Sequence, residues 1–89
     1  MPKRLAADAN RACVDFLLID SEVALTFCGI ALAAKDEGKR RRTTQTARKA
    51  YDTVTRLKND IHLSDAEKAR LDRNLLRLKK DLQCLGENF

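Results

Sequence analysis

The chain has 89 residues, which is the size of a single domain, and a formal net charge of +5. It holds one proline, three glycines, three phenylalanines, one tyrosine and no tryptophan, a composition that favours a few long helices and argues against a sheet. Three cysteines without a C-x-x-C spacing and a single histidine do not supply the ligands of a structural zinc site, and we expect neither a metal nor a cofactor.

The first predicted helix spans about Leu5–Ala34 and is apolar around most of its circumference. On a helical wheel its polar residues fall on one narrow face, formed by Asp8, Arg11, Asp15, Glu22 and Thr26. One apolar side carries Cys13, Phe16, Val23, Ala24, Phe27, Ile30 and Ala31. A second apolar flank consists of Val14, Leu18, Leu25 and Leu32. A helix with so wide an apolar arc must be covered from more than one direction.

The second predicted helix spans about Lys39–Asn59, after a break in the pattern over residues 35–38 in which Gly38 is the stop signal. Its apolar positions lie three and four residues apart and are Ala47, Ala50, Tyr51, Val54, Leu57 and Ile61. Because this stripe is narrow, we expect the helix to pack by one face only.

The third predicted helix spans about Asp65–Leu85 and has the clearest local signals in the chain. Ser64 and Glu67 match a capping box at its start, and Gly86 stands where a C-terminal cap belongs. Its leucines follow alternating steps of four and three residues, at Leu71, Leu75, Leu78, Leu82 and Leu85. This spacing predicts a buried seam along one face of the helix.

The short connections predict antiparallel neighbours, and therefore one all-α domain over residues 1–89, an antiparallel up-down-up three-helix bundle. We expect its core to join the third helix to the first two through three sets of side chains. These sets are Leu71, Leu75, Leu78 and Leu82; Phe16, Val23 and Phe27; and Ala47, Tyr51 and Val54.

The second apolar flank of the first helix has two interpretations. The other helices cover it, or it forms a helix–helix interface with a second copy or another protein, because large exposed apolar patches are rare on monomers. Its heptad spacing favours self-association. We therefore predict a homodimer in which Val14, Leu18, Leu25 and Leu32 form the interface.

The start of the second helix carries the most conspicuous charged feature. Its candidate phosphate-contacting residues are Lys39, Arg40, Arg41, Arg42, Arg48 and Lys49. Clustered cations bind nucleic acids by releasing the counterions of the phosphates. Against this reading, no aromatic side chain is interleaved with the basic residues and no helix-turn-helix spacing is found. Charge runs on small proteins are usually solvated surfaces.

Asp20 falls on the apolar side of the first helix, where an unpaired carboxylate is costly. It should therefore pair with a basic residue of a neighbouring helix, or a small rotation of its own helix should expose it. Cys28 and Cys84 are expected near the same end of the bundle, which leaves open a redox pair. His62 lies in a connection, with a surface or capping role.

The sequence shows no arrangement of residues typical of a catalytic site. No secretory leader is visible, and Asp15, Asp20 and Glu22 make the apolar segment a poor membrane span. These features predict a cytoplasmic, non-catalytic helical interaction protein that self-associates through its first helix. The alternative is a nucleic-acid-associated protein that uses the basic start of the second helix.

Overall fold

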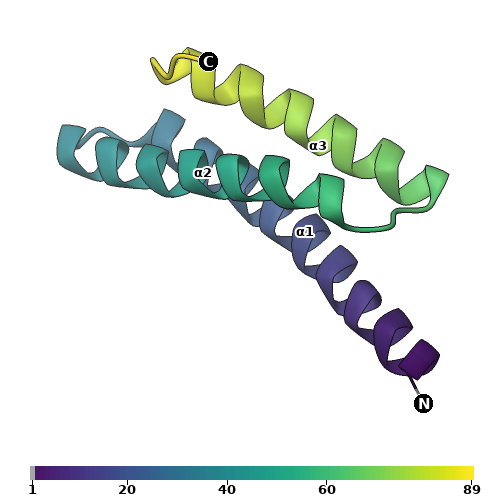
Figure 1. Cartoon of the computed structure of the whole chain (residues 1–89). Coiled ribbons are helices and arrows are strands. Elements are labelled where there is room, and N and C mark those ends of the chain that lie inside the picture. Colours follow the sequence, from purple (N-terminus) through teal and green to yellow (C-terminus); the bar gives the residue numbers. More distant parts are fainter. Residues whose placement is uncertain (1) are drawn as a thin grey trace.

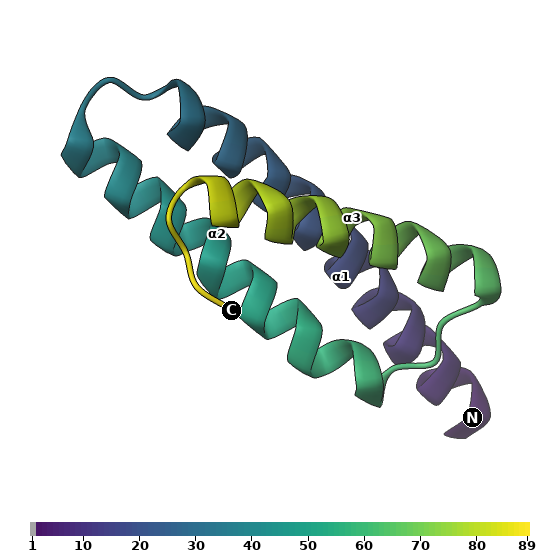
Figure 2. The same ribbon diagram turned by 90° about the horizontal axis from the view of Figure 1, so that it is seen from above.

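The computed structural model describes the backbone of residues 2–89 and the side chains of residues 9–89. The helices in this part of the chain are α1 (Pro2–Ala33), α2 (Glu37–Leu57), the short 3₁₀ helix η1 (Lys58–Asp60) and α3 (Asp65–Cys84). Residues 2–89 contain no strand. The chain runs up, down and up again, so the predicted all-α three-helix bundle is confirmed (Figures 1 and 2).

The bundle is elongated, with principal extents of 52 × 20 × 18 Å. Both α2 and α3 pack mainly on α1 and touch each other less. α1 crosses the other two helices at an angle, and its N-terminal end lies apart from them in Figure 1. One side of α1 is therefore covered by its neighbours while another side is left to solvent.

The turn between α1 and α2 comes earlier in the chain than the sequence predicts. α1 ends at Ala33, and α2 begins at Glu37, one residue before Gly38. Asp36 is the N-cap of α2, because its Oδ1 accepts a hydrogen bond of 3.0 Å from the backbone N–H of Gly38. The prediction that Gly38 stops the first helix is thus wrong, because an N-cap begins the second helix before this residue.

Both ends of α3 are closed as the sequence predicts. The Ser64 hydroxyl accepts from the backbone N–H of Glu67 (3.2 Å), and the Glu67 carboxylate accepts from the backbone N–H of Ser64 (3.0 Å). At the other end Gly86 adopts φ 94°, a conformation that glycine takes without a steric cost. The N–H of Gly86 donates to Gln83 and that of Glu87 to Leu82, which makes a Schellman motif.

The core consists of two clusters along α1. The first cluster contains Val14, Leu17, Leu18, Val54, Leu71 and Leu75. The second cluster contains Ala24, Cys28, Ala47, Leu78 and Leu82. Tyr51 is half-buried and packs against both clusters. Four leucines of the predicted α3 seam, Leu71, Leu75, Leu78 and Leu82, are buried, so the inward orientation of this seam is confirmed.

α1 presents a different face to the core from the one expected. Phe16 and Val23 were expected inside, but they are 51% and 43% exposed. Phe27 is half-buried and packs on the second cluster. The inward face of the C-terminal half instead carries the small residues Ser21, Ala24, Cys28 and Ala31, all fully buried. Small side chains let neighbouring helices approach closely, and this packing turns the bulky residues outward.

Candidate functional site

The predicted interface flank of α1 lies mostly inside the bundle. Val14 and Leu18 are buried in the first core cluster, and Leu25 is half-buried against the second. Leu32, close to the end of α1, is 45% exposed. Val14 and Leu18 are therefore not on the surface that a partner reaches, because the rotation of α1 brings them against α2 and α3.

The exposed apolar surface lies on another face of α1, which we call the α1 seam. Its members follow alternating steps of four and three residues: Ala12, Phe16, Ile19, Val23, Thr26, Ile30 and Ala33. All seven are exposed, including the large side chains of Ile19 (60%) and Phe16 (51%). The Thr26 hydroxyl donates to the Glu22 carbonyl of its own helix (3.3 Å). The seam has the heptad spacing of a helix that packs against another helix.

The spacing of the α1 seam is visible in the sequence, but its exposure is not. Sequence periodicity places Phe16 and Val23 in the core and favours a different heptad line as the free surface. α1 is apolar over most of its circumference, so more than one apolar line has helical spacing. Which line faces inward depends on the packing of small residues, and periodicity does not report this.

The borders of the α1 seam carry acidic residues whose charges are balanced locally. Asp15 pairs with Arg11 of the same helix at 3.2 Å, and Glu22 pairs with Arg70 of α3. Such exposed pairs contribute little stability, but they set the charge at the edge of the surface. Each acidic residue of this border therefore has a cation beside it, although Arg11 also contacts Glu67.

A groove of about 270 Å³ runs between α1 and α2 at the other border of the seam. It is lined by Phe16, Asp20, Thr46, Lys49, Ala50 and Thr53. Asp20 is half-buried there and forms no ion pair among the described residues. Asp20 therefore lacks the predicted ion pair within the described residues, and it is half-buried rather than exposed. The groove places a carboxylate and an ammonium group beside exposed apolar surface.

The six candidate phosphate-contacting residues divide into two groups. Lys39, Arg41, Arg42 and Lys49 are exposed and form no ion pair within residues 9–89. Arg40 instead donates to the carbonyls of Ala31 (3.3 Å) and Ala34 (3.4 Å), at the C-terminal end of α1. A cation at this position complements the negative end of the helix dipole.

The Arg48 side chain also makes contacts within the bundle. Its Nε lies 3.1 Å from Asp52 Oδ1, and its Nη1 donates to the Asn88 carbonyl (2.6 Å). Its guanidinium lies 4.0 Å from the centroid of the Phe89 ring, which also meets Tyr51 edge-on. Arg48 therefore holds the segment after α3 against α2.

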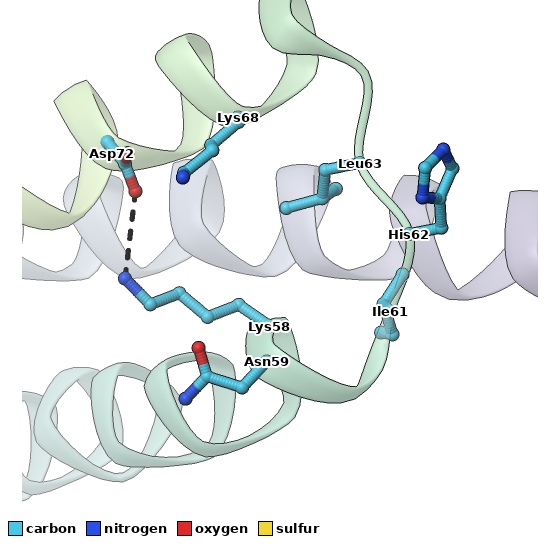
Figure 3. Close-up of a pocket in the computed structure, with 7 residues that line it drawn as sticks. All are labelled: Lys58, Asn59, Ile61, His62, Leu63, Lys68 and Asp72. Atoms are coloured by element: carbon cyan, nitrogen blue, oxygen red, sulfur yellow. Dashed lines mark ion pairs between the residues drawn. The ribbon is translucent and has the colours of Figure 1, made fainter.

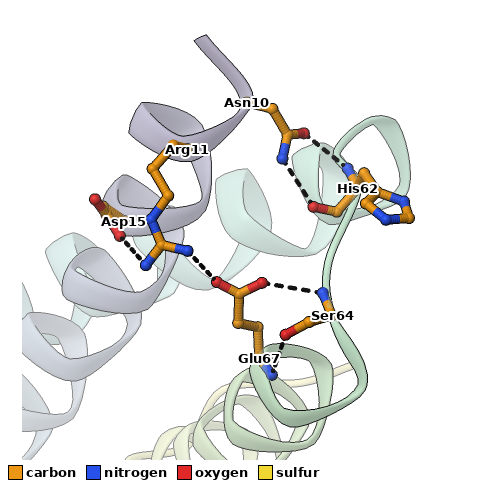
Figure 4. Close-up of polar contacts among 6 residues, drawn as sticks. All are labelled: Asn10, Arg11, Asp15, His62, Ser64 and Glu67. Carbon is orange, nitrogen blue, oxygen red and sulfur yellow. Dashed lines mark hydrogen bonds and ion pairs between the residues drawn. The ribbon is translucent and has the colours of Figure 1, made fainter. Parts of the chain in front are cut away.

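Polar contacts fix α1 both to the connection between η1 and α3 and to the first turn of α3 (Figure 4). The Asn10 carboxamide donates to the His62 carbonyl and accepts from the His62 N–H, each at 3.0 Å. Arg11 Nη1 lies 2.7 Å from Glu67 Oε2. The pKa of the Glu67 carboxylate lies below its usual value, mainly because this group accepts a hydrogen bond from the Ser64 backbone. The Ser64 side chain and the contact with Arg11 lower this pKa further. These contacts leave His62 exposed, with no catalytic partner among the residues that hold it.

The cysteines are all free thiols in two environments. Cys28 is buried, whereas Cys13 and Cys84 are exposed. Burial raises the pKa of the Cys28 thiol to about 11, and the nearby Asp81 carboxylate acts in the same direction. Cys28 and Cys84 are both free thiols, and their redox pairing stays a hypothesis.

No group of three or more His, Cys, Asp or Glu side chains in the described part of the chain is placed to hold a metal ion. The stretch Ala9–Ala33 of α1 is long and apolar enough to cross a membrane, a test that the core helix of a water-soluble bundle also passes.

Comparison with known proteins identifies no relative of this chain. No protein-family model matches the chain, and neither the curated proteins nor the solved structures contain a match.

Proposed function

We propose that this chain is a non-catalytic helical interaction protein that forms a homodimer through the α1 seam. The observation that carries the proposal is that α1 buries its small side chains and exposes several of its large apolar ones. Small residues such as Ala24 and Ala31 are fully buried, while Phe16, Ile19, Val23 and Ile30 remain between 41% and 60% exposed. Burial of such side chains in an interface removes an apolar surface that is otherwise unfavourable in water.

The size of the seam limits what it contributes to a dimer interface. From Ala12 to Ala33 the seam is about 33 Å long at 1.5 Å per residue. A helix with its side chains is about 10–12 Å across, so the seam alone presents a strip on the order of 350 Å². A second copy therefore has to contact the residues on the borders of the seam as well, to reach the roughly 800 Å² that each partner buries in a standard interface.

The charges around the seam also suit a second copy. A twofold interface brings the same patch of both chains together, so the patch must complement itself. Three acidic residues border the seam. Asp15 pairs with Arg11 and Glu22 pairs with Arg70, whereas Asp20 forms no ion pair within residues 9–89 but lines the same groove as Lys49. These basic residues reduce the repulsion that a purely acidic border would cause between two copies.

Light scattering on a sizing column, with the protein reduced, tests the proposal. The parent chain should have twice the 10.1 kDa mass of one chain. Ile19→Glu places a charge in the seam and should give the mass of one chain. Leu76→Glu is the matched control, because Leu76 on α3 is 59% exposed, as Ile19 is 60% exposed, but lies outside the seam. A parent chain with the mass of one copy would contradict self-association.

A second candidate function is binding of nucleic acid by the start of α2. The observation that favours it is the exposure of Lys39, Arg41 and Arg42 without an ion pair in the described residues. Three phosphate contacts would give a slope of about −2.7 in the logarithm of affinity against the logarithm of salt concentration. Fluorescence anisotropy with duplex and single-stranded probes measures this slope, and absence of binding at low salt excludes the function.

A further inference from the structure

A hollow of about 420 Å³ lies at the end of the bundle away from the groove beside Asp20, between η1, the following connection and the start of α3 (Figure 3). It is lined by Lys58, Asn59, Ile61, His62, Leu63, Lys68 and Asp72. This volume is in the range of roughly 300–1,000 Å³ found for small-molecule sites. No part of the α1 seam contributes to the lining.

The polar side chains of this hollow provide more hydrogen-bond donors than acceptors. Lys58 Nζ lies 3.6 Å from Asp72 Oδ1, so one ammonium group has a carboxylate neighbour. Lys68 has no ion pair among the described residues, and its ammonium group points toward the same space in Figure 3. Each ammonium group carries three N–H donors. Two cations with one carboxylate leave a net positive charge, which suits an anion.

The floor of the hollow is apolar. Ile61 and Leu63 are half-buried and pack against the first core cluster. In Figure 3 the Leu63 side chain lies on the side of the lysines, whereas the His62 ring lies on the other side of the connection. An anion with a short apolar body therefore meets both kinds of surface at once.

The hollow is held in shape before any ligand enters. The backbone of His62 makes two hydrogen bonds of 3.0 Å with the Asn10 side chain. Two residues later, Ser64 is fixed by both hydrogen bonds of the capping box with Glu67. Because the connection is fixed on both sides of Leu63, binding requires little additional ordering of the chain.

From this geometry we propose that the hollow binds a small amphipathic anion. Its carboxylate or phosphate head lies between the ammonium groups of Lys58 and Lys68, and its short apolar body contacts Ile61 and Leu63. This site is independent of the α1 seam, so its success or failure leaves the proposed dimer unaffected.

Nuclear magnetic resonance titrations of the full chain test the ligand class with three probes. Hexanoate should cause saturable shifts in the backbone amide signals of residues 58–72. Hexanol keeps the apolar body without the charge, and inorganic phosphate keeps a charge without the apolar body, so both should bind more weakly. Absence of saturable shifts with hexanoate overturns the proposal, as does binding of either other probe with equal affinity.

Matched variants test the position of the head group. Lys68→Gln should weaken hexanoate binding about tenfold, the effect of losing one hydrogen bond to a charged group. Lys80→Gln removes the same charge from an exposed position of α3 that does not line the hollow, and it should leave the affinity unchanged. Equal affinities for the parent and Lys68→Gln, or equal losses in both variants, would overturn the assignment.

Discussion

Arg11 of α1 and Glu67 of α3 are joined by a contact of 2.7 Å between Nη1 and Oε2, although 56 residues separate them in the chain. The other carboxylate oxygen of Glu67 accepts the backbone N–H of Ser64. Glu67 therefore serves two purposes, because one carboxylate caps α3 and also ties it to α1 (Figure 4).

Glu67 should make the stability of the fold depend on pH in the acidic range. Its folded pKa is lowered from 4.5, so its contribution is present above that value and is lost as the pH falls below it. Urea unfolding at neutral pH and at successive values below 4.5 should show a steeper loss for the parent than for Glu67→Gln. The control is Glu37→Gln, in the first turn of α2. Parallel profiles for the parent and Glu67→Gln would contradict the prediction.

Leu78 should be among the most sensitive positions of the core. It is fully buried in the second core cluster, whereas Leu76 on the same helix is 59% exposed. Leu78→Ala should lower the free energy of unfolding by about 2–5 kcal/mol, since it removes buried methyl groups and leaves a cavity. Leu76→Ala should change it by less than about 0.5 kcal/mol. Urea unfolding measures both, and equal effects would mean that the helix faces are assigned wrongly.

α3 could be predicted from the sequence because its signals are local. The capping box of Ser64 and Glu67, the leucine spacing and Gly86 each act within a few residues, and all three are found in the structure. The face of α1 could not be predicted in this way. It depends on how closely α2 approaches the small residues around Ala24, which is a property of the packed bundle.

The candidate sites also combine features that the sequence shows with features that only the packed bundle shows. The alternating spacing of the α1 seam is present in the sequence, but its exposure is not. The fixed connection beneath the proposed anion site depends on Asn10 and His62, which are 52 residues apart. Neither residue belongs to a recognisable motif, so only the packing of α1 against the connection brings them together.

A buried polar contact should couple α1 to α3 energetically. Asn74 Nδ2 donates to Ser21 Oγ at 3.1 Å, and the Ser21 hydroxyl donates to the Leu18 carbonyl at 2.9 Å. Ser21 is fully buried and Asn74 is partly buried. A double-mutant cycle with Ser21→Ala and Asn74→Ala should give a coupling free energy of about 0.5–1.5 kcal/mol. A value near zero, measured by urea unfolding, would mean that this contact does not stabilise the bundle.

The three thiols should differ in reactivity. Cys13 and Cys84 are exposed, whereas Cys28 is buried and its pKa is raised to about 11. Only the thiolate is nucleophilic, so Cys28 should react slowly for two reasons, lack of access and lack of ionisation. A disulfide exchange reagent should modify two thiols of the folded chain quickly and the third only after denaturant is added. Rapid modification of all three would contradict the burial of Cys28.

Ionisation of the Cys28 thiol should lower the free energy of unfolding of the bundle in the alkaline range. Its pKa is 9.0 when unperturbed and about 11 in the fold, so the unfolded chain loses the proton first as the pH rises. The stabilisation is therefore complete below pH 9 and falls between pH 9 and about 11. Cys28→Ala removes this ionisation, so its free energy of unfolding should fall less steeply over that interval. Cys84→Ala is the control and should follow the parent, because the thiol that it removes is exposed. If Cys28→Ala also followed the slope of the parent, ionisation of Cys28 would not be linked to folding.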